Sequence, residues 1–219
     1  NLAWEILQGL PALTVVAAQK NNKARKIQKL INTTNFCVYT NTDIIGVELG
    51  GALKNIIALG AGIIDGLNLG NNTKSALITR GLTEISAVGV ALGASPITFS
   101  GLSGLGDLVT TCASTLSRNH YVGVELAKGR SLKDIIDSMD SVAEGVATTK
   151  AAWELSEKMG LEMPITEKLY QVLYKGHAPR KAAKELMEIA AAHELAGRRW
   201  RLFDFFRRRR RKLPPAPDQ

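Results

Sequence analysis

One lysine in this sequence interrupts an apolar, glycine-rich stretch and has no opposite charge beside it. Lys54 lies within residues 46–57, and on an ideal helix it shares a face with Gly50 and Gly51. An amine in that position either extends along apolar surface to water or projects into a cleft, where it can act as a general acid or base. The residues by themselves leave both alternatives open.

A second candidate follows a glycine-rich loop. Asp107 comes directly after residues 101–106, and three of these six residues are glycines that let the backbone approach a ligand or a neighbouring helix closely. Asp107 could therefore face a ligand, or it could simply cap a helix that begins there. The glycines do not form a dinucleotide-binding turn, because no strand precedes them.

Residue types that suit anions come next along the chain. Ser117, Arg118 and Asn119 stand at the start of a predicted helix, where main-chain N–H groups and a planar guanidinium favour a phosphate or carboxylate. Glu144, beside Gly145, could accept hydrogen bonds from a ribose or an amide. The simpler alternatives are a solvated loop arginine and a glutamate that the helix dipole stabilises. Together these residues fit a small phosphorylated alcohol or ketone.

The hydrophobic pattern predicts which elements position these residues. Residues 1–42 contain one strand–helix–strand unit, predicted over 11–19, 20–33 and 36–41, which we interpret as the end of an α/β domain. From residue 43 the strand signals stop. Helices are then predicted over residues 43–65, 73–93, 108–114, 119–129, 131–138, 145–159, 164–175 and 179–196.

The sequence therefore predicts a mainly α protein with a helical domain over residues 43–196. We expect Asn71, Asn72 or Thr73 to cap the second long helix. Residues 94–107 are predicted to form a loop that is rich in glycine and serine.

The formal net charge of +8 is concentrated at one end of the chain. Residues 198–219 hold nine basic and two acidic residues, whereas the remaining 197 residues hold 19 basic and 18 acidic ones. A nearly neutral body argues against general nucleic-acid binding. The basic segment 197–219 is predicted to be disordered. It either contacts RNA or an anionic membrane through its arginines and aromatic residues, or has no selected role.

Other function classes are disfavoured by composition. The two cysteines, Cys37 and Cys112, provide no disulfide framework, so we expect a reduced, cytoplasmic protein. The three histidines have no metal-ligand spacing. Glu48 and Lys54 interrupt the most apolar stretch, which argues against a membrane span.

Several long motifs in this sequence resemble the bacterial-type NAD(P)-dependent glycerol-3-phosphate dehydrogenases. They occupy residues 39–55 (YTNTDIIGVELGGALKN), 70–81 (GNNTKSALITRG), 104–112, 117–119 and 142–145. The resemblance covers about residues 1–189. It implies an all-helical dehydrogenase C-terminal domain, of the 6-phosphogluconate dehydrogenase C-terminal type, preceded by the last strand–helix–strand remnant of a Rossmann domain over residues 1–42.

The resemblance also implies a reaction, which is the reversible reduction of dihydroxyacetone phosphate to sn-glycerol 3-phosphate in phospholipid precursor synthesis. The hydride donor would be NADH or NADPH, without a metal, and a homodimer is compatible with it. Lys54 would be the catalytic acid or base, and Thr111 is a second-rank candidate. The implied substrate contacts are Lys54, Asp107, Ser117, Arg118 and Asn119. The implied cofactor contacts are Ala3, Arg118, Val142 and Glu144.

Two features depart from the family pattern. The G-x-G-x-x-G half of a Rossmann domain is missing, together with a substrate lysine that the family carries there. We therefore expect the 219 residues to be a fragment that binds NAD(P)H weakly and is inactive alone. The basic end is the second departure, and it supports an alternative, a non-catalytic helical assembly module with an anchoring tail. Another phosphosugar or hydroxyacid dehydrogenase is a related alternative, although residues 117–119 favour a phosphorylated substrate.

Overall fold

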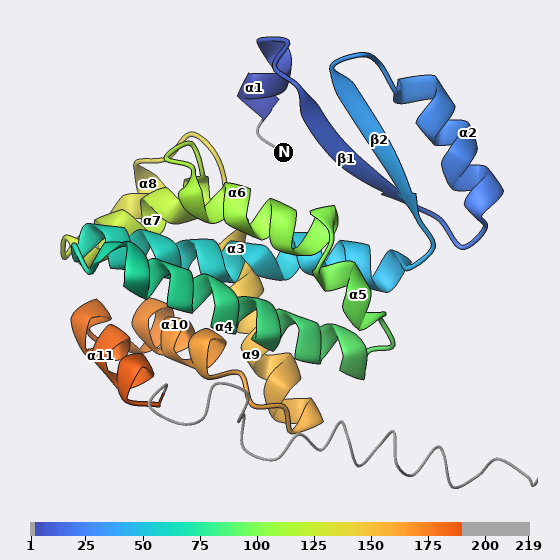
Figure 1. Ribbon diagram of the computed structural model, residues 1–219. Coiled ribbons are helices and arrows are strands. Elements are labelled where there is room, and N and C mark those ends of the chain that lie inside the picture. Colours follow the sequence, from blue (N-terminus) through green and yellow to red (C-terminus); the bar gives the residue numbers. More distant parts are fainter. Residues whose placement is uncertain (1–2, 190–219) are drawn as a thin grey trace, which may run out of the picture.

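The computed structural model describes residues 3–189, which begin with a small α/β unit (Figure 1). Its strands β1 (Ala12–Ala17) and β2 (Phe36–Asn41) pair in parallel, and α2 (Asn21–Ile31) is the crossover between them. A parallel pair needs such a crossover because its two strands run in the same direction. The short helix α1 (Ala3–Leu7) precedes the unit and was not predicted from the sequence.

The rest of the described chain is helical, as predicted from residue 43 onward. One π-helical turn, η1, interrupts the α-helices. These elements are α3 (Ile44–Gly66), α4 (Gly70–Ala91), α5 (Pro96–Phe99), η1 (Leu102–Gly106), α6 (Asp107–Ala113), α7 (Arg118–Ala127), α8 (Leu132–Asp137), α9 (Glu144–Met159), α10 (Pro164–Lys175) and α11 (Pro179–Ile189).

Helix α3 is the centre of this helical part. It packs against α4, α6, α7 and α9 (Figure 1), and most residues of its second half are buried. Within the described residues it is the one helix that is long and apolar enough to cross a bilayer, but 56% of its most apolar window is buried against the protein. Packing on several sides explains why α3 is apolar nearly all round.

Two glycines let α7 cross α3 at close range. A Cβ at Gly62 on α3 would collide with the carbonyl oxygen of His120, and a Cβ at Gly123 on α7 would collide with that of Leu59. Both collisions involve backbone, which cannot move aside as a flexible side chain can. The crossing therefore fixes where the start of α7 lies along α3.

Two sequence predictions were wrong, namely the side-chain cap at the start of α4 and the loop over residues 94–107. Helix α4 begins at Gly70 without a side-chain cap, because the positive φ angles of Asn68 and Gly70 turn the chain into the helix before the polar residues are reached. The hydroxyl of Thr73 donates instead to the Leu69 carbonyl oxygen at 2.9 Å. The predicted loop 94–107 contains α5 and η1, whose short lengths give little periodic signal.

Asp43 joins the start of α3 to the segment after α4. It caps α3 by accepting from the Gly46 N–H at 2.9 Å, and it also accepts from the Ser95 N–H at 2.8 Å and the Thr98 hydroxyl at 2.7 Å. Burial alone would raise the pKa of Asp43, but these three hydrogen bonds hold it below its ordinary value. One carboxylate thus sets α5 and η1 against the beginning of α3.

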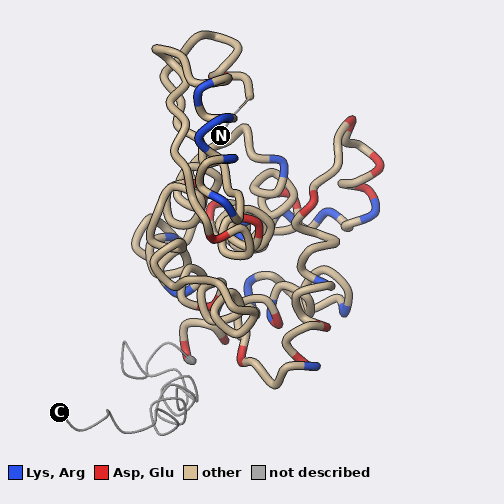
Figure 2. The backbone as a smooth tube through the Cα atoms, turned by 90° about the vertical axis from the view of Figure 1, so that its right-hand side faces the viewer, with Lys and Arg blue, Asp and Glu red and all other residues tan. Residues whose placement is uncertain are grey.

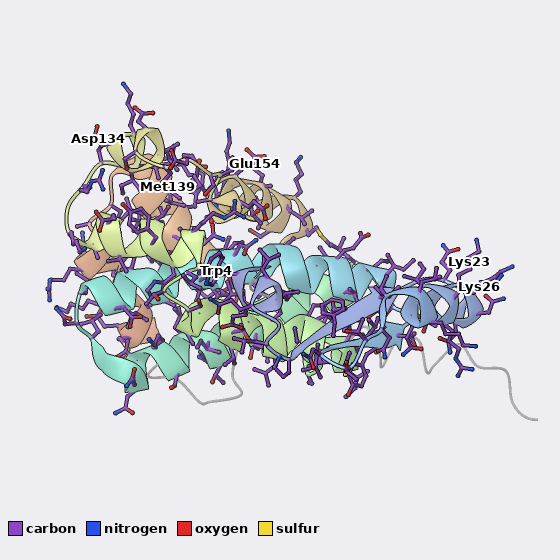
Figure 3. The ribbon with its side chains drawn as sticks, turned by 90° about the horizontal axis from the view of Figure 1, so that it is seen from above. Trp4, Lys23, Lys26, Asp134, Met139 and Glu154 are labelled. Atoms are coloured by element: carbon purple, nitrogen blue, oxygen red, sulfur yellow. The ribbon has the colours of Figure 1, made fainter. Side chains whose placement is uncertain are left out.

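The α/β unit carries its own charge pattern. Residues 6–42 hold five basic residues and no acidic one, and Figure 2 shows this basic end of the molecule. Lys23 and Lys26 on α2 point away from the helical part, at the opposite end of the view from Asp134 on α8 (Figure 3). The predicted disordered segment 197–219 lies outside the described residues.

A fully buried carboxylate holds α10 against α4. Glu84 accepts from the N–H groups of Ile165 and Thr166 at 2.9 Å each, and from the Thr166 hydroxyl at 2.6 Å. It therefore caps the first turn of α10 from another helix. Burial raises the pKa of Glu84 from 4.5 to about 7, and the three donors only partly offset that effect.

This pKa predicts a pH dependence of stability. The folded chain holds the Glu84 proton more tightly than the unfolded chain, so its contribution is full below pH 4.5 and is lost as the pH rises through 7. Between about pH 5 and pH 8, we expect wild type to lose about 2 kcal/mol more unfolding free energy than Glu84→Gln, which cannot ionise. Urea unfolding at the two pH values measures this difference, and equal losses in both proteins would contradict it.

Candidate active site

Lys54 has a counter-charge that its own helix does not provide. Its Nζ forms an ion pair with Asp107 Oδ2, which comes from the first residue of α6. The Lys54 side chain is 16% exposed and that of Asp107 is 20% exposed, so both are largely enclosed yet reachable from solvent. An enclosed amine held by a carboxylate can give a proton to a bound oxygen or take one from it.

The turn η1 places Asp107 opposite Lys54. This π-helical turn ends at Gly106, immediately before Asp107. It lies against α3 because Gly50 has no side chain, and a Cβ there would be 2.5 Å from the Ser103 carbonyl oxygen. Gly50 stands one helical turn before Lys54, so the close approach of η1 and the ion pair belong to the same part of α3.

Two further helices begin beside the ion pair. Asn119, in the first turn of α7, accepts from the Gly145 N–H, in the first turn of α9, at 2.9 Å. Gly145 lies against α3, since a Cβ there would be 2.6 Å from the Asn55 carbonyl oxygen. The side chain of Asn55 also donates to Glu144 Oε2 at 3.4 Å. The first residue of α6 therefore contacts Lys54, and the first turn of α9, which is bonded to that of α7, contacts Asn55.

This arrangement favours an anion. The N-terminal ends of α7 and α9 carry partial positive charge. Arg118 is the first residue of α7 and is exposed, so its guanidinium is accessible to solvent at the start of that helix. The region thus offers one ion-paired amine for proton transfer and one guanidinium for a charged group.

The other residues that the sequence suggested for the site have different surroundings in the structure. Ser117 is buried, and its hydroxyl caps α7 by accepting from the His120 N–H at 3.3 Å. Thr111 donates to the Asp107 carbonyl oxygen at 2.6 Å, within α6. Val142 is 72% exposed just before α9. Ala3 is exposed on α1, at the other end of the described chain.

Sequence reasoning missed several polar residues next to this region. Asn55 lies in the quoted motif, but nothing local indicates its contact with Glu144, 89 residues away. Asp65 pairs with Lys74 and His120. The short turn predicted between the two long helices is a sequence signal for the contact with Lys74 but not for the contact with His120. Burial raises the pKa of the nearby Cys112 thiol to about 12, although the charge of Lys54 opposes this.

The arrangement belongs to a known family. Residues 43–184 match the family model described as the C-terminus of NAD-dependent glycerol-3-phosphate dehydrogenase. The chain belongs to this family. The residues that match this glycerol-3-phosphate dehydrogenase family include α3, η1, α6, α7 and α9. These elements provide the contacts around Lys54 and Asn55 described above.

Individual relatives agree with this assignment. The glycerol-3-phosphate dehydrogenase [NAD(P)+] of Dehalococcoides mccartyi is 68% identical over 215 residues, which are 98% of this chain and 60% of that protein. That of Geobacter metallireducens is 53% identical over 187 residues, covering 85% and 56%. The chain thus spans about 60% of the length of the D. mccartyi relative and somewhat less of the other.

A solved structure shows the same fold. The crystal structure of glycerol-3-phosphate dehydrogenase from Coxiella burnetii superposes with a TM-score of 0.83 at 38% sequence identity, covering 85% of this chain and 57% of that one. The match confirms the expected fold, mainly helical with a short parallel strand pair at the N-terminal end.

The adjacent glycines Gly50 and Gly51 provide a matched test of how η1 is positioned. Alanine at Gly51 meets nothing within 4 Å and improves helix propensity, so we expect Gly51→Ala to raise the unfolding free energy by about 0.5–1 kcal/mol. Alanine at Gly50 collides with the Ser103 carbonyl oxygen, so Gly50→Ala is expected to lower it by about 1–3 kcal/mol. Urea unfolding of both variants measures this, and similar effects in the two would show that η1 does not rest on Gly50.

Proposed function

We propose that this chain is the substrate-binding and proton-transferring part of a glycerol-3-phosphate dehydrogenase. The relatives' names state glycerol 3-phosphate as substrate and NAD(P)+ as oxidant. Oxidation of the secondary alcohol at C2 gives dihydroxyacetone phosphate. The observation that carries the proposal is the ion pair between Lys54 and Asp107 at the start of α6.

Lys54 is the proposed acid and base. In the reduction direction its ammonium group donates a proton to the C2 oxygen as negative charge develops there, and in the oxidation direction its amine removes the hydroxyl proton. Asp107 holds the Lys54 Nζ in place through the ion pair. This pairing supports an enzyme over a non-catalytic assembly module, which has no need of an enclosed, paired amine.

The substrate phosphate is assigned to the start of α7. Arg118 is exposed there, and the N-termini of α7 and α9 favour a doubly charged anion. Asn119 holds the two helix starts together by accepting from Gly145. Ser117 supports this turn, because its hydroxyl caps the start of α7. Thr111 is a further candidate, since its hydroxyl donates to the Asp107 carbonyl oxygen.

NADH or NADPH, when bound, supplies the hydride. The residues of this chain fit one side of such a cofactor: Arg118 suits a phosphate, and Glu144 at the start of α9 suits a ribose hydroxyl. Val142 and Ala3 are exposed and could add apolar contacts. Within residues 3–189 no strand is followed by a G-x-G-x-x-G turn, and we assign the pyrophosphate cradle to residues outside this chain.

Partner and location follow from the same proposal. The substrate pair is dihydroxyacetone phosphate and glycerol 3-phosphate, and the cytoplasm is the proposed location. A domain division at residue 42 or 43 is also part of the proposal, since the family match begins at residue 43.

Loss of the Lys54 amine tests the proposal directly. The chain is joined to the upstream cofactor domain of the D. mccartyi relative, and NADPH oxidation with dihydroxyacetone phosphate is followed by absorbance. We expect Lys54→Ala to lower kcat by at least about 100-fold, because it removes the proton donor. The matched control is Lys150→Ala on α9, whose side chain is 56% exposed and should not matter.

Two outcomes would contradict the proposal. One is the absence of turnover in the joined wild-type protein. The other is a Lys54→Ala protein that retains kcat while circular dichroism shows an unchanged fold.

The unjoined chain provides a second test. Without a pyrophosphate cradle, we expect the 219 residues to bind NADPH with a Kd weaker than about 1 mM, which corresponds to about −4 kcal/mol. Isothermal titration of NADPH into the chain measures this, and a micromolar Kd would show that these residues hold the cofactor by themselves.

A further inference from the structure

A second charged cluster lies on α3 beyond the pair of Lys54 and Asp107. Asp65, near the end of α3, accepts from Lys74 Nζ at 2.8 and 2.9 Å through its two oxygens. Its Oδ2 is also 2.7 Å from His120 Nε2. One carboxylate therefore connects α3, α4 and α7, and no step of the proposed reaction uses it.

The cluster belongs to the same helix as the reactive lysine, since Asp65 and Lys54 both lie on α3. The charges of Lys74 and Lys54 oppose the raised pKa of the buried Cys112 thiol on α6, and the charge of Asp65 adds to it. Burial alone would raise the pKa of Asp65, but Lys74 and His120 together hold it below its ordinary value. The carboxylate thus stays ionised, and the ammonium of Lys74 offsets its charge.

The cluster holds the helix start that carries Arg118 and Asn119. His120 is the next residue of α7, and its side chain is 8% exposed. Asn119 is bonded to Gly145 of α9, while His120 is bonded to Asp65 of α3. The first turn of α7 is thus fixed to two different helices through adjacent residues, and the exposed Arg118 precedes them.

Side chains add to what the backbone contacts define at this turn. The glycines at the crossing of α3 and α7 set the distance between the helices and the position of α7 along α3, and side-chain contacts restrain small rotations of α7 about its own axis. The Ser117 cap is a long hydrogen bond of 3.3 Å within α7 itself. The charge-assisted bond between His120 and Asp65, together with the bond from Gly145 to Asn119, restrains the angle of the first turn about the α7 axis.

We propose that Asp65, Lys74 and His120 are positioning residues that orient the first turn of α7, and with it Arg118 and Asn119, for the phosphate of the substrate. This inference rests on the proposed function. The cluster touches neither the substrate nor the reacting atoms. Its loss therefore weakens phosphate binding while leaving the proton transfer by Lys54 intact.

The test separates binding from chemistry in the joined protein described above. We expect His120→Leu to raise the KM for dihydroxyacetone phosphate about tenfold and to leave kcat within about twofold, which is the signature of lost uniform binding. His120→Gln retains an N–H donor near the position of Nε2, so it should restore KM to within about twofold of wild type.

A matched control comes from a second histidine–carboxylate pair. His177 is 3.2 Å from Glu185 and lies between α10 and α11. His177→Leu removes the same kind of contact away from α7, so its KM should be unchanged. If His120→Leu does not fold, Asp65→Asn replaces it, because asparagine keeps the shape of the residue and loses its charge. Its KM should rise about threefold or more.

The possible outcomes distinguish a failure of this inference from a failure of the proposed function. Absence of turnover in the wild-type joined protein overturns both. Turnover that Lys54→Ala abolishes, together with a KM that His120→Leu or Asp65→Asn leaves unchanged, overturns the inference alone. A fall in kcat without a change in KM, or an equal rise of KM in His177→Leu, also overturns it.

Discussion

The ion pair between Lys54 and Asp107 is the interaction on which the functional region depends. An ammonium group in the middle of a largely buried helix needs a counter-charge, because its desolvation is not offset by anything within α3 itself. Asp107 provides that charge only because α6 begins at that residue and because η1 directs it toward α3. The start of α6, the π-helical turn and Gly50 are therefore parts of one arrangement around the Lys54 Nζ.

Close backbone contact is the second constraint. Gly50 admits η1, Gly62 and Gly123 admit α7, and Gly145 admits α9. Each of these glycines removes a side chain where the backbone of another segment lies against α3, and the contacts extend from Gly50 near its start to Gly62 near its end. The first turn of α7, bonded to that of α9, carries the exposed Arg118, whose full positive charge adds to the partial charge of the helix end.

Carboxylates connect helices that are distant in the sequence. Asp43 joins the start of α3 to α5, Asp65 joins α3 to α4 and α7, and Glu84 joins α4 to α10. Each accepts at least three hydrogen bonds or ion-pair contacts, which offsets the cost of enclosing a carboxyl group. For Glu84 that compensation is incomplete, because its burial is complete and no cation pairs with it in the described part of the chain.

The sequence by itself determined the helical class, most helix positions and the residue types at the candidate site. Helix 164–175 and strand 36–41 were predicted with their observed ends, since apolar periodicity, a proline and flanking polar residues are local signals. The quoted motifs also identified the family, which the match over residues 43–184 confirms. Only the tertiary structure decided that Lys54 pairs with Asp107, that Asp65 holds His120, and that residues 102–106 form a π-helical turn. These features depend on contacts between residues more than fifty positions apart and on how helices pack, and periodicity within a few residues carries no information about either.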